Sequence, residues 1–110
     1  MSFQRALSIL RDLNSSHRVI NRDLTNFTAL MKLLGNPQEQ FKKIHITGTN
    51  GKGSVTLKTA SVLANAGFKA GMYTSPHLFT FRERIQINEQ MIDRDTVAEY
   101  IVSINKLVQK

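Results

Sequence analysis

The sequence predicts an α/β fold in which a parallel sheet is flanked by helices. Residues 42–47, "KKIHIT", and residues 69–74, "KAGMYT", are short apolar runs typical of buried strands. Between them, residues 54–67, "SVTLKTASVLANAG", have the pattern of a helix that Gly67 would end. A strand–helix–strand order built of short apolar strands indicates a parallel sheet.

Two helices are predicted before the first strand. Apolar residues recur at helical spacing in residues 3–13 and again in residues 24–34. Gly35 is a natural residue to follow the second helix, and Pro37 prevents its continuation.

A loop, a strand and a helix are predicted after residue 74. Residues 75–83 have the character of a loop, and residues 84–88, "RIQIN", alternate as a half-exposed strand does. Residues 93–110 then show helical spacing, with Thr96 or Asp93 as the N-terminal cap. So few strands make a poor sheet, and we therefore expect an incomplete domain, the first part of something larger.

Composition excludes several classes of protein. The 110 residues are 41% hydrophobic and contain no Cys, which excludes disulfides, thiolate metal sites and a thiol nucleophile. No apolar run approaches the roughly 18 residues of a membrane span. We expect a cytoplasmic protein without a membrane partner. Residues 1–22 are rich in Arg and Ser, so a mitochondrial presequence stays open beside the favoured interpretation, an amphipathic surface helix.

The formal charge of +7 favours an anionic partner. The basic residues are spread along the chain and show no cluster with interleaved aromatic side chains. We therefore expect an anionic small molecule and no nucleic acid.

Residues 45–54, "HITGTNGKGS", form the most informative segment. Its glycines permit the positive φ angles of an anion-binding backbone nest, and Lys52 adds a mobile positive charge. A strand before and a helix after are the context of a phosphate loop. The segment departs from the pattern G-x-x-x-x-G-K-[ST], because Ile46 replaces the first glycine and Gly53 separates Lys52 from Ser54. His45 precedes the loop, and we expect it to be structural.

Longer segments that follow one another as in a known family narrow the assignment from a general phosphate loop to that family. "TGTNGKGS" resembles the ATP-binding loop of the folylpolyglutamate synthase and dihydrofolate synthase branch of the Mur ligase superfamily. Residues 66–88, "AGFKAGMYTSPHLFTFRERIQIN", and residues 30–38, "LMKLLGNPQ", resemble neighbouring blocks of that branch. The resemblance covers residues 21–88. It implies a P-loop-containing Mur-ligase-type central domain, with residues 1–110 as the N-terminal part of this ATP-binding domain and the C-terminal glutamate ligase domain absent.

The resemblance also implies cofactors and residue roles. ATP and Mg²⁺ would be the cofactors, with Lys52 as the catalytic residue. The ATP phosphates would be bound by residues of the glycine loop: Thr49, Asn50, Gly51, Lys52, Gly53 and Ser54. Ser75 matches a serine that ligates Mg²⁺, and a hydroxyl is a hard oxygen ligand suited to this ion. The family's other Mg²⁺ ligands would lie beyond residue 110.

Folate contacts are expected at two places. Residues Asn21, Arg22, Asp23 and Leu24 lie where the family has a pteroate-contacting segment, although "NRDL" departs from the usual pattern. His77, Phe81 and Arg82 are candidates to face a pterin ring or a carboxylate. The alternative is that Phe79 and Phe81 belong to the core and that residues 82–84 form a solvated charged turn.

The expected function is the ATP-dependent ligation of L-glutamate to folate or dihydropteroate through an acyl phosphate, in one-carbon metabolism. The full-length family member would be a monomer, and the 110-residue chain an inactive N-terminal fragment. Two alternatives stay open. One is a non-catalytic nucleotide-binding remnant. The other is a small basic nucleic-acid-binding protein, whose affinity would fall steeply with salt.

Overall fold

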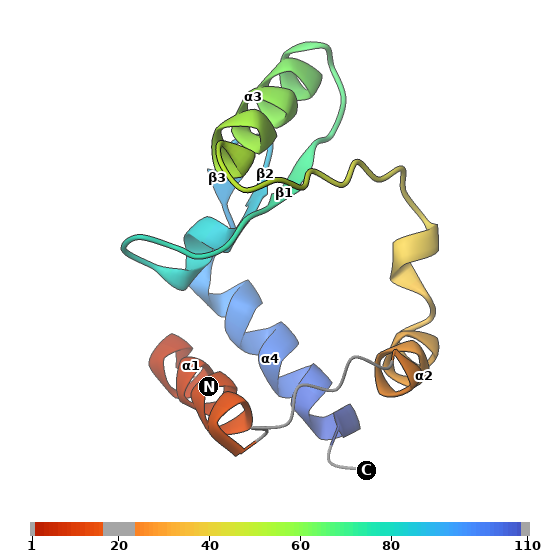
Figure 1. The fold of residues 1–110 in the computed structure, drawn as a ribbon. Helices are drawn as coiled ribbons and strands as arrows, with labels where there is room; N and C mark the ends of the chain where they lie inside the picture. The colour runs from red at the N-terminus through yellow and green to blue at the C-terminus, as the bar shows by residue number, and fades with distance from the viewer. Residues whose placement is uncertain (1, 17–23, 109–110) are drawn as a thin grey trace. The chain divides into compact units, whose positions relative to one another are not determined.

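A computed structural model describes residues 2–16 and 24–108 (Figure 1). The chain divides into two compact units. The first comprises Met1–Lys43 and Asp95–Lys110, and the second comprises Ile44–Arg94. Among the described residues, no helix is both long enough and apolar enough to cross a membrane.

The first unit is helical. It contains α1 (Phe3–Ser16), α2 (Thr25–Leu33), a short 3-10 helix (Pro37–Glu39) and nearly all of α4 (Arg94–Val108). Among its described residues, the buried apolar side chains are those of Ala6, Val97 and Ala98, whereas α2 buries none. The three α-helices confirm the predicted ones, and Gly35 follows α2 with a φ of 83°.

The second unit is α/β. It contains α3 (Lys52–Asn65), β1 (Gly71–Tyr73), a 3-10 helix (Phe81–Arg84), β2 (Ile85–Ile87) and β3 (Gln90–Met91). The three strands are ordered β1-β2-β3, and both pairings are antiparallel. The prediction of a parallel sheet is therefore not confirmed in the described part of the chain. Residues 42–47, expected as its first strand, are not assigned to a strand.

Two chain reversals explain the antiparallel order. Between β1 and β2 the chain turns back through residues 74–84, and the Thr74 amide donates to the Arg84 carbonyl at 3.0 Å to close this turn. Between β2 and β3 lies a two-residue hairpin in which Asn88 and Glu89 have φ values of 49° and 66°. Two consecutive positive φ angles are typical of the tight turn that matches the twist of the strands. The sequence pattern did not predict β3.

A small core joins α3 to the sheet. Ala60 of α3 is buried, as are Ala70 and Met72 on the β1 side. Asn88 fixes the start of β1, because its side-chain oxygen accepts from the Ala70 amide at 2.9 Å and its amide donates to the Ala70 carbonyl at 2.9 Å. These apolar side chains lie where α3 packs against β1.

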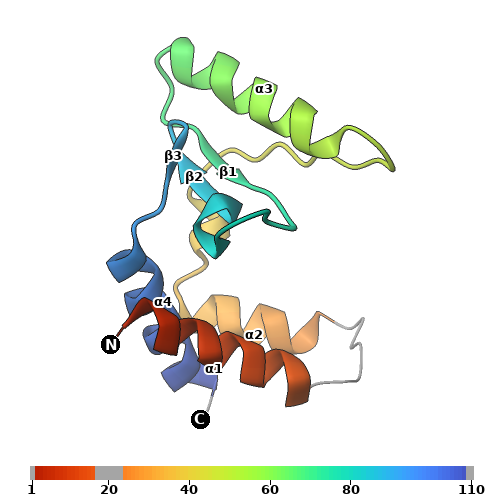
Figure 2. The ribbon, with the colours of Figure 1, turned by 90° about the vertical axis from the view of Figure 1, so that its left-hand side faces the viewer.

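The direction of α3 brings the end of the glycine loop and the end of β1 together. The helix begins at Lys52, two residues before the predicted Ser54, and the chain reverses at Gly67, whose φ is 94°. It then enters β1, which runs opposite to α3 (Figure 2). The N-terminus of α3 and the C-terminal end of β1 therefore lie at the same end of this unit.

Candidate functional site

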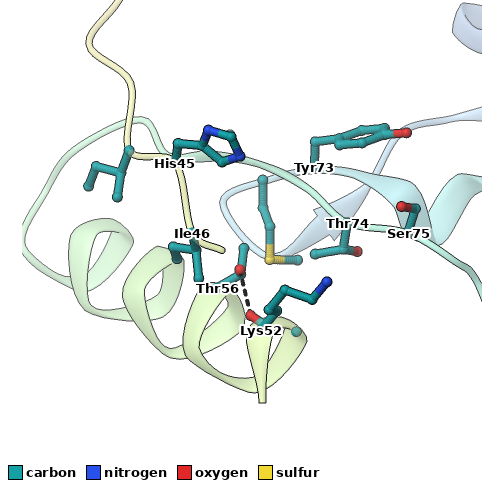
Figure 3. A pocket seen from close by; sticks show the side chains of 11 residues that line it. His45, Ile46, Lys52, Thr56, Tyr73, Thr74 and Ser75 are labelled. Atoms are coloured by element: carbon teal, nitrogen blue, oxygen red, sulfur yellow. Dashed lines mark hydrogen bonds between the residues drawn. The ribbon is translucent and has the colours of Figure 1, made fainter. Parts of the chain in front are cut away.

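An open pocket of about 430 Å³ lies at that end of the second unit (Figure 3). It is lined by three segments: the chain before the glycine loop, the first turns of α3, and the end of β1. The lining residues are Ile44, His45, Ile46, Lys52, Gly53, Thr56, Gly71, Met72, Tyr73, Thr74 and Ser75.

The glycine loop leads into α3 through left-handed backbone. Gly51, at the N-cap position, has a φ of 76°, and Gly48 has a φ of 149°. Residues with a Cβ rarely adopt these angles, so both positions favour glycine. Gly51 also provides no side-chain cap. The first amides of α3 have no partner within the helix, and together with the helix dipole they favour a bound anion.

Lys52 is the first residue of α3, and its side chain extends toward Thr74 across the pocket (Figure 3). The Thr56 hydroxyl donates to the Lys52 carbonyl at 2.7 Å, and this bond stabilises the first turn of α3, which carries the lysine. Thr74 and Ser75 follow β1 on the other side. The pocket thus joins one flexible cation to several hydroxyl groups.

The lining chemistry suits an oxyanion. Lys52 provides positive charge, and Thr74 and Ser75 provide hydroxyls, whereas the Thr56 hydroxyl already donates its proton to the Lys52 carbonyl; the lining includes no carboxylate. In the part of the chain that the structure describes, no group of three or more His, Cys, Asp or Glu side chains could hold a metal ion.

The structure brings together only part of the predicted phosphate-binding set. Of that set, Lys52 and Gly53 line the pocket, and Ser75, the predicted Mg²⁺ ligand, lines it as well. Thr49, Asn50, Gly51 and Ser54 are exposed and do not line it.

Sequence reasoning missed Thr56, Tyr73 and Thr74 as lining residues, and it placed His45 on a structural strand that the described structure does not form. Thr74 could have been found from its place next to Ser75. Thr56 could have been found from its spacing of one helical turn from Lys52.

The turn after Ser75 contains a second cluster. The His77 and Phe81 rings are 6.1 Å apart at 72°, and the Arg84 guanidinium lies 5.4 Å from the Phe81 centroid. Arg84 Nε donates to His77 Nδ1 at 2.9 Å, so Nδ1 is an acceptor and the imidazole proton lies on Nε2.

Arg82 lies apart from the His77 cluster, because its Nε donates to the Ile92 carbonyl at 2.7 Å, and the arginine beside His77 and Phe81 is Arg84. Phe79 is 93% exposed, so the alternative that it belongs to the core is wrong.

The structure does not test the folate contacts predicted for residues 21–24. Asn21, Arg22 and Asp23 lie outside the described residues. Leu24 directly precedes α2 in the first unit, and its side chain is exposed.

Fold and site together define a class: an α/β unit with a glycine-rich loop, a lysine at a helix N-terminus and an oxyanion-compatible pocket. No family model matches the chain. A folylpolyglutamate synthase from Lacticaseibacillus casei is 38% identical over 88 residues, covering 80% of this chain and 21% of the relative. Over most of its length the chain thus belongs to the folylpolyglutamate and dihydrofolate synthase family, and it spans about a fifth of the length of the curated relatives it matches.

Solved structures give the same assignment. Folylpolyglutamate synthase from Thermotoga maritima superimposes with a TM-score of 0.83 at 40% identity, covering 96% of this chain and 24% of that one. An FPGS complex with AMPPCP and folate superimposes with a TM-score of 0.82 at 31% identity, covering 99% of this chain and 26% of that one. The described fold is therefore that of a small part of these enzymes.

Proposed function

We propose that the second unit binds the phosphates of ATP in a folylpolyglutamate or dihydrofolate synthase, and that the chain corresponds to the N-terminal part of the ATP-binding domain. The observation that supports this most directly is that Lys52 and Ser75, which are far apart in the sequence, line one pocket. An FPGS relative in complex with AMPPCP, an ATP analogue, supports the choice of nucleotide.

The proposed reaction of the whole protein is a two-step ligation. An oxygen of the folate carboxylate attacks the γ-phosphorus of ATP, which forms an acyl phosphate and releases ADP. The amine of L-glutamate then attacks the acyl carbon, the C–O bond breaks, and phosphate leaves with the electron pair while the amine loses a proton. Phosphoryl transfer requires mainly positioning and neutralisation of charge, which are the contributions this pocket can make.

Each site residue has a proposed role in the first step. Lys52 neutralises charge on the terminal phosphates, as a catalytic residue that touches the transferred group. The loop from Thr49 to Ser54 offers its backbone amides to the phosphate oxygens. Gly53 leaves room for this approach, because no other atom lies within 4 Å of a Cβ built there.

Ser75 is the proposed protein ligand of Mg²⁺. Mg²⁺ keeps several waters and binds substrate phosphates, so a single hydroxyl beside the phosphate pocket fits the ion. The ion would supply charge neutralisation on the phosphate oxygens. Thr74 lines the pocket beside Ser75 and offers a second hydroxyl.

We further propose that the 110 residues alone bind nucleotide without forming folate polyglutamates. This rests on the absence of a carboxylate from the pocket lining and on the chain matching about a fifth of its relatives. Incubation with ATP, folate and labelled glutamate tests the proposal, and labelled product from the isolated chain would overturn it.

Titration of Mg·ATP into the chain by calorimetry tests the nucleotide assignment. Because a hydrogen bond to a charged group contributes about 1.5–3 kcal/mol, Lys52→Ala should weaken binding by roughly 10- to 100-fold. Lys58→Ala is the matched control, since Lys58 is an exposed lysine of α3 that does not line the pocket. Equal affinities of the two variants would contradict the assignment. Salt-sensitive binding to duplex DNA that ignores Lys52→Ala would favour the nucleic-acid alternative.

A further inference from the structure

Arg84 contacts the chain on both sides of Ser75. Its backbone carbonyl accepts from the Thr74 amide at 3.0 Å, and its side-chain Nε donates to His77 Nδ1 at 2.9 Å. Thr74 directly precedes Ser75, and His77 follows it by two residues. One residue of the 3-10 helix Phe81–Arg84 therefore holds both flanks of the serine that lines the pocket (Figure 3).

Phe81 supports the contact between Arg84 and His77. The Phe81 and His77 rings meet edge to face, with centroids 6.1 Å apart at 72°, and the Arg84 guanidinium lies 5.4 Å from the Phe81 centroid. All three side chains are half-buried, so water competes less for the hydrogen bond than it would at an exposed site. The imidazole and the guanidinium are thus each held by two partners.

Ser75 depends on these neighbours for its position. It is exposed, and it makes no hydrogen bond to any other residue in the part of the chain that the structure describes. A serine hydroxyl is separated from the backbone by a single torsion with three staggered positions. Restraint of the backbone on both sides of Ser75 therefore limits its oxygen to a few places at the edge of the pocket.

The two residues that precede Arg84 on the same 3-10 helix hold other segments. Arg82 Nε donates to the Ile92 carbonyl at 2.7 Å, which links the helix to the chain after β3. The Glu83 carboxylate accepts from the three amides of residues 78–80 at 3.1, 2.8 and 2.7 Å, which holds the far part of the turn. Of the three neighbours, Arg84 is the one whose contacts flank the residue at the pocket.

We propose that Arg84 is a positioning residue that fixes Ser75 at the edge of the pocket through Thr74 and His77. That the ligand bound there is Mg²⁺ with the phosphates of ATP rests on the proposed function. Arg84 acts through its neighbours and needs no contact with the ligand. Mg²⁺ demands near-ideal octahedral geometry, so its binding is sensitive to the position of a ligating oxygen. A hydroxyl that is already in place also loses less freedom when the ligand binds.

The first arm of the test measures the restraint without ligand. Arg84→Lys keeps the positive charge but loses the planar guanidinium that reaches His77. Backbone order parameters from 15N relaxation of the whole chain should fall at Ser75 and His77, from about 0.85 to below about 0.6. Residues 78–80 should keep their order, because Glu83 still holds them.

Arg82→Lys is the matched control for this arm, since Arg82 lies on the same helix and makes a similar Nε bond, to Ile92. It should leave the order of Ser75 unchanged. Equal order at Ser75 in Arg84→Lys and in the unmodified chain would overturn the restraint.

The second arm measures affinity by calorimetry, with Mg·ATP and with ATP in EDTA as separate probes. Arg84→Lys should weaken Mg·ATP binding about tenfold, as expected for a residue that orients a metal ligand, and leave binding in EDTA unchanged. In a Ser75→Ala background, Arg84→Lys should have no further effect, because the hydroxyl that it positions is gone.

A purely structural role of Arg84 predicts different results in the second arm. It would weaken binding equally with and without Mg²⁺, or add to the effect of Ser75→Ala, and either result would overturn the positioning role. If the unmodified chain binds no Mg·ATP, the proposed function is contradicted, while the order parameters still decide whether Arg84 fixes Ser75.

Discussion

The glycine loop and the turn of residues 75–84 meet at the same end of the second unit but are built in opposite ways. The glycine loop has left-handed residues at Gly48 and Gly51 and no side-chain cap at the start of α3. The turn satisfies the amides of Leu78, Phe79 and Thr80 with its own Glu83 carboxylate. Backbone amides without a partner in the glycine loop favour binding of an external anion. The amides of the turn are already bonded to Glu83, which favours a fixed backbone conformation.

This difference separates two contributions to binding. The glycine loop would supply charge and hydrogen bonds to the ligand, so its substitutions should change affinity for nucleotide. The turn would supply preorganisation, so its substitutions should change local order first and affinity as a consequence. The predictions below test this division, beginning with the largest effect.

Gly51→Val should have the largest effect, because it forces a β-branched residue into a φ of 76°. Strain of this kind costs about 1–3 kcal/mol, so we expect a lower midpoint of thermal unfolding and loss of Mg·ATP binding. Circular dichroism and calorimetry measure the two quantities.

Gly53→Ala is the matched variant in the same loop. Gly53 is helical, its φ is not positive, and a Cβ there has nothing within 4 Å. Replacing a helical glycine by alanine should raise stability by about 0.5–1 kcal/mol, while the added methyl group narrows the approach to the loop and weakens nucleotide binding. Equal destabilisation by both variants would show that the loop is not shaped by left-handed backbone.

Ser75→Ala should weaken nucleotide binding about tenfold when Mg²⁺ is present, since the hydroxyl is the proposed ligand of the ion. In EDTA the two proteins should bind ATP equally. Ser103→Ala, on α4 in the first unit, serves as the control. If Ser75→Ala weakens binding to the same extent in EDTA, the hydroxyl contacts phosphate and does not ligate the metal.

Thr80→Val should destabilise the turn by about 1 kcal/mol, because it removes the oxygen that caps the 3-10 helix. Amide exchange should become faster only in residues 78–84. Thr80→Ser should restore the slower exchange. Lower protection across β1 as well would mean that the turn and the sheet are not independent.

The pH dependence of the turn should be the smallest effect. Hydrogen bonds from the backbone amides of Thr80, Leu78 and Phe79 lower the pKa of Glu83 from its ordinary 4.5. A lowered pKa in the folded state means that the stabilisation is complete above the ordinary value and is lost as pH falls through the lowered one. Arg82 and Arg84 are the charged neighbours on the same 3-10 helix, and the adjacent β2 and β3 contain no titratable side chain.

NMR chemical shifts of the amides of residues 78–80 measure this titration. We expect a shared transition with a midpoint below 4.5, which Glu83→Gln abolishes. A midpoint at or above 4.5 would contradict the arrangement of bonds around the carboxylate.

Local sequence patterns predicted the helices well. The apolar spacing of residues 24–34 and the Gly35–Pro37 ending correspond closely to α2, and Asp93 directly precedes α4, at the earlier of the two predicted caps. The strand expected in residues 69–74 contains β1, and that expected in residues 84–88 contains β2. Helix periodicity and turn residues act over a few positions, which is why these elements could be predicted.

The arrangement of the strands could not be predicted in the same way. Residues 42–47 have the composition of a strand, but a strand also needs a hydrogen-bonded neighbour, and the described structure provides none for them. The antiparallel order depends on the reversal closed by Thr74 and Arg84 and on the left-handed pair Asn88 and Glu89. The sequence pattern indicated a loop over residues 75–83 but not that it returns the chain antiparallel, and it did not indicate the hairpin at Asn88 and Glu89.

The sequence by itself determined the chemical parts of this protein: a glycine-rich loop around Lys52, a hydroxyl at Ser75, and the motifs of the folylpolyglutamate and dihydrofolate synthase family. Only the tertiary structure decided how these parts are used. It placed Lys52 and Ser75 on one pocket, paired Arg84 with His77, and turned Glu83 inward onto its own backbone. Residue types fix which interactions are possible, whereas the direction of α3 against β1 and the closure of one turn fix which of them form.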